Sequence, residues 1–308
     1  MSAETLGRVE PFAFFDVRVA AIQDLGPSFR RFTFRGDGLA DFADPGWDQR
    51  IKLVFPLPGH GLTTMPRTPD WYGEWRRLPE EQRPPFRTYT TRSVRRDPDE
   101  LDVDVVLHRP LLGPASRWAS SARLGDELLI LGPHRGYSGL HGGIDFVPPA
   151  RADRLLLAGD ETAAPAIAVI LEQLPPDARG TAIVELPSPR DAGYLPAHPG
   201  IEIRAVIRGG RDHGSALVRA VEEAAAELGV ASGAAAELDD IDVDRQILWE
   251  VPRSDLGGAA LDISPIYAWL AGESAAIKTL RRHLVRDRGI DRRSVAFMGY
   301  WRIGRSEI

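Results

Sequence analysis

The pattern of apolar residues changes near residue 150, and this change constrains the fold more than any other feature of the chain. Before it, short β-rich segments follow one another closely, and residues 101–108 alternate apolar and polar side chains like a half-buried antiparallel strand. After it, strands alternate with helical segments, the order that builds a parallel, doubly wound sheet. We therefore expect two domains, a small antiparallel barrel or sandwich over residues 1–150 and an α/β domain over residues 151–308.

Several segments stand out within these domains. Residues 57–86 are rich in proline and glycine, which predicts a long surface excursion with one short helix. Residues 215–229 and 273–289 read as helices of the second domain. Residues 230–262 contain an acidic, Ala/Gly-rich insertion that fits neither pattern.

Composition excludes several classes of protein and site. The chain has no cysteine, which excludes disulfides, iron–sulfur clusters and cysteine-ligated zinc, so any redox chemistry needs a bound organic cofactor. Its seven histidines form no zinc motif, and we expect no metal held by the protein. The formal charge of −6 argues against general nucleic-acid binding. No apolar run approaches the roughly 20 residues of a membrane span, and the N-terminus lacks a signal core, so we expect a cytoplasmic protein, and a monomer.

The segment RTYTTR, residues 87–92, places two cations and an aromatic ring in a strand. Taken alone, it is typical of an exposed edge strand. A second interpretation comes from residues 111–122, where Gly113 precedes a short helix whose first-turn amides, with Ser116 as capping hydroxyl, can receive an anion. Arginines and a helix start suit a pyrophosphate, and a tyrosine suits a fused ring. The two segments together indicate a dinucleotide whose flavin lies against Tyr89.

The same segment poses a geometric difficulty. In an ideal strand, Arg87 and Tyr89 share one face, whereas Thr90 and Arg92 share the other. One regular strand cannot present all four to a single ligand, so we expect a twist, a bulge or a cofactor that wraps around the strand end.

Two further segments place an acidic turn between a buried strand and a helix, at residues 155–167 and 268–278. Open α/β sheets bind ligands at the carboxyl ends of such strands, although a helix capped by Asp160 or Thr162 explains the first segment equally well. Neither segment is a glycine-rich dinucleotide fingerprint. Residues 272–276 imitate the nucleophile elbow of α/β-hydrolases, but too little chain follows to complete a triad.

The motifs RTYTTR, GPASRWA, AGDETAAPAI, YAWLAGES and GYWRIG, in this order, resemble the siderophore-interacting protein family, flavin-dependent ferric-siderophore reductases related to ferredoxin–NADP reductases. The resemblance spans roughly residues 12–304. It implies an N-terminal FAD-binding antiparallel β-barrel and a C-terminal NAD(P)H-binding α/β domain with a doubly wound parallel sheet. Carried over by position, it implies an FAD site made by Arg87, Tyr89, Thr90, Arg92, His108, Gly113, Ala115, Ser116 and Thr162. It further implies a nicotinamide bordered by Ala271, Gly272 and Glu273, and a reacting centre at Tyr89, Thr90 and Thr162.

The resemblance also implies a reaction. A reduced nicotinamide delivers two electrons as hydride, whereas Fe(III) accepts one, and a flavin converts between the two. Siderophores hold Fe(III) through hard, anionic oxygens and hold Fe(II) far more weakly, so reduction releases the iron. An anionic ferric complex needs a cationic surface, for which the candidates are Lys52, Arg135 and Arg302.

Several alternatives remain open. The electron donor is NADH, NADPH or a reduced ferredoxin, and we favour NAD(P)H, with Arg190 as a candidate reader of a 2′-phosphate. The chain could also be another flavin or ferredoxin-type reductase of the same architecture. A third reading is a siderophore-binding flavoprotein without turnover.

Overall fold

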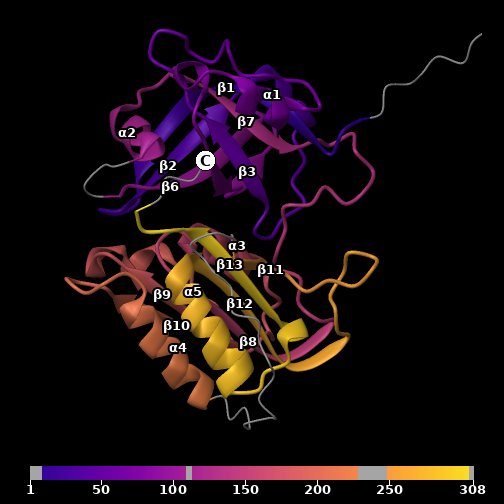
Figure 1. Ribbon diagram of the computed structural model, residues 1–308, viewed down its shortest axis with the longest axis vertical. Coiled ribbons are helices and arrows are strands. Elements are labelled where there is room, and N and C mark those ends of the chain that lie inside the picture. The colour runs from indigo at the N-terminus through magenta and orange to yellow at the C-terminus, as the bar shows by residue number, and fades with distance from the viewer. Residues whose placement is uncertain (1–8, 109–112, 228–247, 305–308) are drawn as a thin grey trace, which may run out of the picture. The chain divides into compact units, whose positions relative to one another are not determined.

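The computed structural model describes residues 9–108, 113–227 and 248–304, and the contacts within the chain divide it into two units (Figure 1). The first, here the barrel unit, runs to Asp24 and resumes over Arg30–Gly143. The second, here the α/β unit, combines Leu25–Phe29 with the chain from Ile144 onward. None of the helices in the described ranges is long and apolar enough to cross a membrane.

The barrel unit is a curled antiparallel sheet of seven strands, as the sequence predicts. Phenylalanines of its core pack around the indole of Trp118, with Phe32 at 4.9 Å and Phe55 at 5.5 Å between ring centroids. The strand order is β4-β3-β7-β1-β2-β6-β5, with β1 (Phe12–Asp24), β2 (Phe29–Arg35), β3 (Arg50–Val54), β4 (Phe86–Thr90), β5 (Ser93–Arg95), β6 (Glu100–Val106) and β7 (Glu127–Pro133). The helices are α1 (Trp71–Arg77), in the predicted excursion, and α2 (Pro114–Ser121).

The two edges of this sheet are consecutive in the chain. Strands β4 and β5 lie at opposite ends of the strand order and are joined by only Thr91 and Arg92. The Thr91 amide donates to the Gln49 carbonyl at 2.9 Å, next to β3, and the Arg92 amide donates to the Asp102 carbonyl of β6 at 2.9 Å. The chain thus changes pairing partner between these two residues, which brings the sheet edges together. We call this point the seam.

Strand β6, predicted to be half-buried, is buried on both faces. Its apolar residues enter the core as expected, but Asp102 and Asp104 are only 4% and 1% exposed. The expectation of a solvated polar face was wrong because neighbouring strands supply arginines. Arg31 of β2 binds Asp104 with two hydrogen bonds of 2.7 and 2.8 Å, and Arg95 of β5 binds Asp102.

Acid should weaken the barrel through Asp102. Burial raises the pKa of this carboxyl, but hydrogen bonds from Arg95, Thr33 and Ser93 outweigh that effect and hold the pKa below its ordinary value. A carboxyl with a lowered folded-state pKa contributes stability above its unfolded pKa, and this contribution is lost as pH falls from about 4 through the folded value. In urea titrations at stepped pH, the free energy of unfolding should therefore fall more steeply below pH ~4 for the wild type than for Asp102→Asn. Parallel curves would contradict this expectation.

The α/β unit contains a six-stranded sheet in the order β10-β9-β8-β12-β13-β11. Its first five strands are parallel, as predicted, and β11 is an antiparallel edge strand. The strands are β8 (Arg151–Gly159), β9 (Gly180–Leu186), β10 (Ile201–Ile207), β11 (Trp249–Glu250), β12 (Ile263–Glu273) and β13 (Val295–Trp301). Of the insertion predicted over 230–262, residues 230–247 lie outside the described residues. The rest of it, from residue 248, includes β11.

Helices cover both faces of this sheet. Helices α4 (Ser215–Glu227) and α5 (Ser274–Arg281) bury Leu217 and Ile277 in one apolar cluster with the sheet, and α3 (Ala164–Gln173) contributes no residue to that cluster (Figure 1). The helix predicted over 273–289 ends as an α-helix at Arg281 and continues as a π-helix over Arg282–Asp287. From β8 the chain winds toward β9 through α3, and after β12 it winds the opposite way through α5. The winding reverses between β8 and β12, and such a switch point is where open α/β sheets bind ligands.

Candidate functional site

The RTYTTR segment ends β4 and crosses the seam. Arg87 and Tyr89 lie in β4, where Tyr89 is half-buried and packs against the barrel core. Thr90, the last residue of the strand, is buried. Arg92 lies beyond the change of pairing partner, so it does not obey the alternation of β4. The break expected from the sequence is therefore a change of strand partner.

Asp104 anchors the arginine at the seam. Its carboxylate is fully buried and lies 3.4 Å from Nε of Arg92, while it also accepts the paired hydrogen bonds of Arg31. Asp104 thus neutralises two arginines, Arg31 on β2 and Arg92 just before β5. The sequence analysis missed Asp104 as a partner of these arginines, because β2 and β6 become neighbours only in the fold.

Helix α2 begins in the same unit, but its cap differs from the predicted one. Gly113 is the N-cap and no side chain caps the helix, so the expectation that Ser116 supplies the capping hydroxyl was wrong. Ser116 is buried instead, and its oxygen accepts from the amide of His108 at 3.4 Å. Ala115 is buried beside it. A Cβ built on Gly113 would meet no atom within 4 Å among the residues that the structure describes.

The predicted substrate cations are spread over both units. Lys52 of β3 donates to the Thr88 hydroxyl at 3.3 Å and lies 5.1 Å from the ring centroid of Phe86. Arg135, just after β7, is exposed and donates its amide to the carbonyl of Asp41. Arg302 follows β13 in the α/β unit and is half-buried.

At the switch point of the α/β unit, one carboxylate joins three strand ends. Asp160 follows β8, and its Oδ2 accepts from the amide of Glu273, the last residue of β12, at 2.8 Å. The same oxygen accepts from the indole Nε1 of Trp301, the last residue of β13, at 2.8 Å. Its Oδ1 accepts from the amide of Thr162 at 2.9 Å and from the Thr162 hydroxyl. The sequence analysis considered Asp160 as part of a ligand-binding strand end or as a helix cap, and the structure places the N-cap of α3 at Ala163.

A second buried network lies at the ends of β8, β9 and β10. The Arg208 guanidinium donates to both oxygens of Glu161, at 2.8 and 3.0 Å, and Glu185 lies 3.4 Å away. Glu185 also accepts from three amides at the start of α4, so it caps that helix. Nδ1 of His213 lies 2.8 Å from the Arg208 guanidinium, and its ring meets the Trp301 indole edge to face at 5.0 Å. The sequence analysis singled out none of these four residues.

The remaining predicted residues of the α/β unit occupy different environments. Thr162 is half-buried, while Ala271 and Gly272 are fully covered within β12. Glu273 caps α5, because one carboxylate oxygen accepts from the amides of Ala275 and Ala276. Ser274, in the sequence that imitates a nucleophile elbow, donates its hydroxyl to the carbonyl of Trp301 at 2.9 Å.

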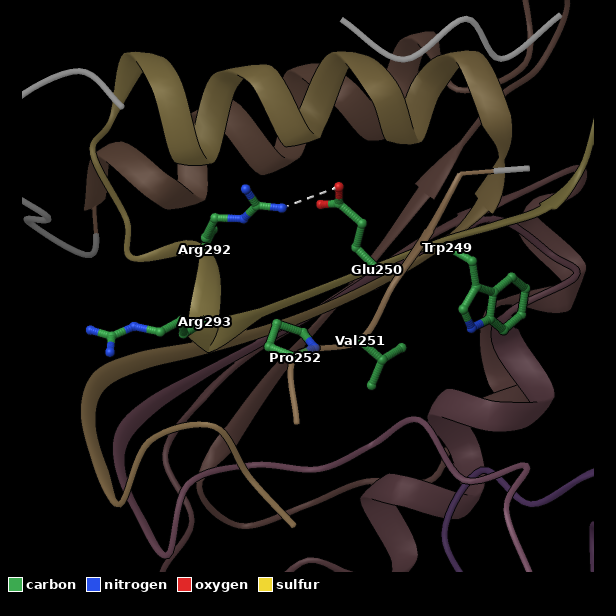
Figure 2. A pocket seen from close by; sticks show the side chains of 6 residues that line it. All are labelled: Trp249, Glu250, Val251, Pro252, Arg292 and Arg293. Atoms are coloured by element: carbon green, nitrogen blue, oxygen red, sulfur yellow. Dashed lines mark ion pairs between the residues drawn. The ribbon is translucent and has the colours of Figure 1, made fainter. Parts of the chain in front are cut away.

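Arg190, the candidate 2′-phosphate reader, lies exposed in a 3-10 helix over Pro189–Tyr194 that follows β9. A separate pocket of about 380 Å³ lies beside the edge strand β11 (Figure 2). No predicted site residue lines it, and its walls carry an ion pair of 3.5 Å between Arg292 and Glu250. The pocket is lined by Trp249, Glu250, Val251, Pro252, Arg292 and Arg293.

The barrel unit suits an anionic dinucleotide with a fused ring. Arg92 forms an ion pair with the buried Asp104, Tyr89 offers an aromatic face, and a Cβ on Gly113 at the start of α2 would meet no described residue within 4 Å. In addition, the Thr91 hydroxyl at the seam is buried and has no hydrogen-bond partner among the described residues. An arginine, a helix N-terminus and a hydroxyl are groups that a pyrophosphate and a flavin ring would use, so the residues fit FAD.

Comparison with known proteins gives the family. The model of the siderophore-interacting FAD-binding domain matches residues 18–137, and the model of the siderophore-interacting protein matches residues 152–304. The chain belongs to the siderophore-interacting protein family. The resemblance described above and the two-domain fold that it implies are confirmed, and the family makes the chain a flavoprotein oxidoreductase of siderophore handling.

Individual members of the siderophore-interacting protein family cover most of the chain. An uncharacterized protein of Mycobacterium tuberculosis is 34% identical, over 94% of this chain and 90% of its own. The ferric vibriobactin reductase ViuB of Vibrio cholerae is 29% identical, over 83% of this chain and 89% of its own. The crystal structure of a siderophore utilization protein from T. fusca is 28% identical, with a TM-score of 0.69, and covers 98% of this chain and 97% of that one.

Proposed function

We propose that the chain is an FAD-dependent reductase of ferric siderophores, which takes hydride from NAD(P)H and passes single electrons to Fe(III). The observation that carries the proposal is the seam, where an arginine anchored by a buried acid, an aromatic face and an unpaired hydroxyl lie within the region matched by the FAD-binding model. We place the reaction in the cytoplasm because reduced nicotinamides are available there. When bound, FAD would supply the conversion between a two-electron and a one-electron transfer.

The residues of the barrel unit would bind and orient this group. Arg87 and Arg92 would neutralise its phosphates, and Tyr89 would cover one face of the ring. Thr90 would hydrogen-bond to the edge of the flavin ring near its reacting atom. The remaining members of this proposed site are His108, Gly113, Ala115 and Ser116.

The switch point of the α/β unit would receive the nicotinamide. Thr162, Ala271, Gly272 and Glu273 lie at the ends of the two strands between which the winding reverses, and this position supports the proposal. Of the last three, Ala271 and Gly272 are buried, and Glu273 uses its carboxylate to cap α5 and its amide to bind Asp160. Arg190 is the proposed reader of a 2′-phosphate, and a reduced ferredoxin is the alternative donor.

The iron is substrate in this scheme and needs no ligand from the protein. Fe(III) stays in the siderophore, and its reduction weakens the hold of the hard oxygens, so Fe(II) leaves. For the electrons to balance, one NAD(P)H must reduce two ferric complexes, which gives NAD(P)⁺, a proton and two Fe(II). Lys52, Arg135 and Arg302 would attract the anionic complex.

Neutralising Lys52 should weaken the binding of anionic substrates selectively. With an anionic ferric siderophore as acceptor, Lys52→Gln is expected to raise KM about fivefold, as the loss of one partly exposed charge contact costs about 1 kcal/mol. KM for an uncharged dye should not change, because the dye gains nothing from the ammonium group. The matched control is Lys278→Gln, which removes the only other lysine, on α5. Equal effects on both acceptors would contradict the assignment of Lys52 to substrate binding.

Turnover distinguishes the proposal from its alternatives. Purified protein loaded with FAD should oxidise NAD(P)H and give Fe(II), trapped by a chelator, only when a ferric siderophore is present. Reduction of free flavin, a ferredoxin or a quinone without trapped Fe(II) would favour another reductase of this fold. Binding of the ferric siderophore with no oxidation of NAD(P)H would favour a binding protein. The similarity to ViuB, a ferric vibriobactin reductase, supports the first outcome.

A further inference from the structure

The Asp160 carboxylate is the most heavily hydrogen-bonded acid described at the switch point. It is 1% exposed, and its four partners are the Thr162 amide, the Thr162 hydroxyl, the Glu273 amide and the Trp301 indole. An ionised carboxylate has no proton to donate, so all four partners donate and the carboxylate accepts every bond. Because each partner belongs to the end of a different strand or to the turn before α3, Asp160 holds this edge of the sheet together.

The neighbouring backbone is adapted to this carboxylate. Gly272 has φ of +150°, and a Cβ added there would lie 2.8 Å from Oδ2 of Asp160. A side chain at residue 272 would therefore push the carboxylate away from its donors. Glycine at this position leaves the space that Asp160 occupies.

The surrounding charges are already paired with one another. Burial raises the pKa of Asp160, and the adjacent Glu161 raises it further. Glu161 is bound by two guanidinium nitrogens of Arg208, and His213 contacts both the Arg208 guanidinium and the Trp301 indole. The hydrogen bonds from Thr162 and Trp301 act in the opposite direction and favour the ionised acid.

The hydrogen bond from Thr162 fixes what its hydroxyl can offer to a ligand. Since Oγ1 gives its proton to Asp160, only the lone pairs of that oxygen remain for another partner. Thr162 is half-buried, so part of the residue remains accessible to a ligand. An oxygen that can only accept suits a ligand with N–H groups, such as the carboxamide of a reduced nicotinamide.

We propose that Asp160 is a positioning residue for the nicotinamide: it orients the Thr162 hydroxyl as a hydrogen-bond acceptor and fixes the Trp301 indole beside it. The inference rests on the proposed function, which places Thr162 at the hydride-transfer site. It adds a residue that touches neither cofactor and acts through Thr162.

The test combines a structural readout with a kinetic one. In full-length protein carrying ¹⁵N-labelled tryptophan, the Nε1–H resonance of Trp301, assigned with Trp301→Phe, should shift in Asp160→Asn, because the amide replaces an acceptor by a donor. The KM for NAD(P)H in anaerobic flavin reduction should rise about tenfold in the same variant. The matched control is Asp153→Asn, an exposed acid on the same strand, which should change neither quantity.

Thr162→Val provides a second, milder variant in case Asp160→Asn does not fold. It removes the hydroxyl alone, so the KM for NAD(P)H should rise about as much as in Asp160→Asn, while the Trp301 resonance stays in place. Thr162→Ser keeps the hydroxyl, so its KM should rise less. A shifted resonance with unchanged KM in Asp160→Asn, or an unchanged KM in Thr162→Val, would overturn the inference. If the wild type itself oxidises no NAD(P)H with any acceptor, the proposed function fails together with the inference. If the wild type is active but the variants keep its KM, only the inference fails.

Discussion

Asp104→Asn is expected to lower the free energy of unfolding of the barrel unit by about 3 kcal/mol, because it leaves two arginines without their buried counter-charge. Asp104 is fully buried, and both Arg31 and Arg92 have less than a quarter of their side chains exposed. Water therefore cannot replace the lost carboxylate. The measurement is denaturant unfolding followed by tryptophan fluorescence, since Trp118 lies in the barrel core.

The control for this prediction is another acid–arginine pair on the same sheet. Asp24 binds Arg30 at 2.6 Å, but its side chain is 66% exposed. Asp24→Asn should cost less than about 1 kcal/mol, as is usual for exposed ion pairs. Equal losses in the two variants would show that burial of Asp104 does not decide its contribution.

Arg92→Gln is expected to weaken FAD binding by about ten- to a hundredfold, since a charge-assisted hydrogen bond contributes about 1.5 to 3 kcal/mol. Arg87→Gln should have a similar effect, because it removes the second cation of the segment. The dissociation constant is measured by titrating apoprotein with FAD and following the quenching of flavin fluorescence. Asp104→Asn should also weaken binding, because Arg92 loses its anchor.

Arg18→Gln is the matched control for these flavin titrations. Arg18 lies on β1 of the same unit and forms a pair with Glu127 in which both side chains are mostly exposed. Its removal changes the net charge by the same amount as Arg92→Gln. If all three variants bind FAD equally well, the seam is not the flavin site.

The sequence predicts the architecture well because its two periodicities are local. Alternation over a few residues identifies the strands of the barrel unit, and strand–helix alternation identifies the parallel sheet. The difficulty noted for Arg87 and Arg92 also has a structural answer, since the chain changes partner at Thr91. The sequence shows that the regular strand must end within this segment, but it does not show which strands pair with the chain before and after that point.

The residues that the sequence analysis missed act over long separations. Asp104 binds an arginine 73 residues away, and Asp160 binds a tryptophan 141 residues away. A buried acid and a solvated acid look alike in an alternating strand, and only the fold brings the arginine to one of them. Ser116 was misjudged for a related reason: a serine near a helix start usually caps it, whereas here Gly113 is the cap and the amide of His108 binds the hydroxyl.

The most direct test of the proposed reaction is its electron balance. FAD-loaded protein is mixed anaerobically with NADH or NADPH and with the ferric complex of a catecholate or a hydroxamate siderophore, in the presence of an Fe(II) chelator. The account predicts about two Fe(II) trapped for each nicotinamide oxidised, because hydride carries two electrons and each Fe(III) accepts one. Oxidation of the nicotinamide with no trapped Fe(II) from either class of siderophore would contradict it.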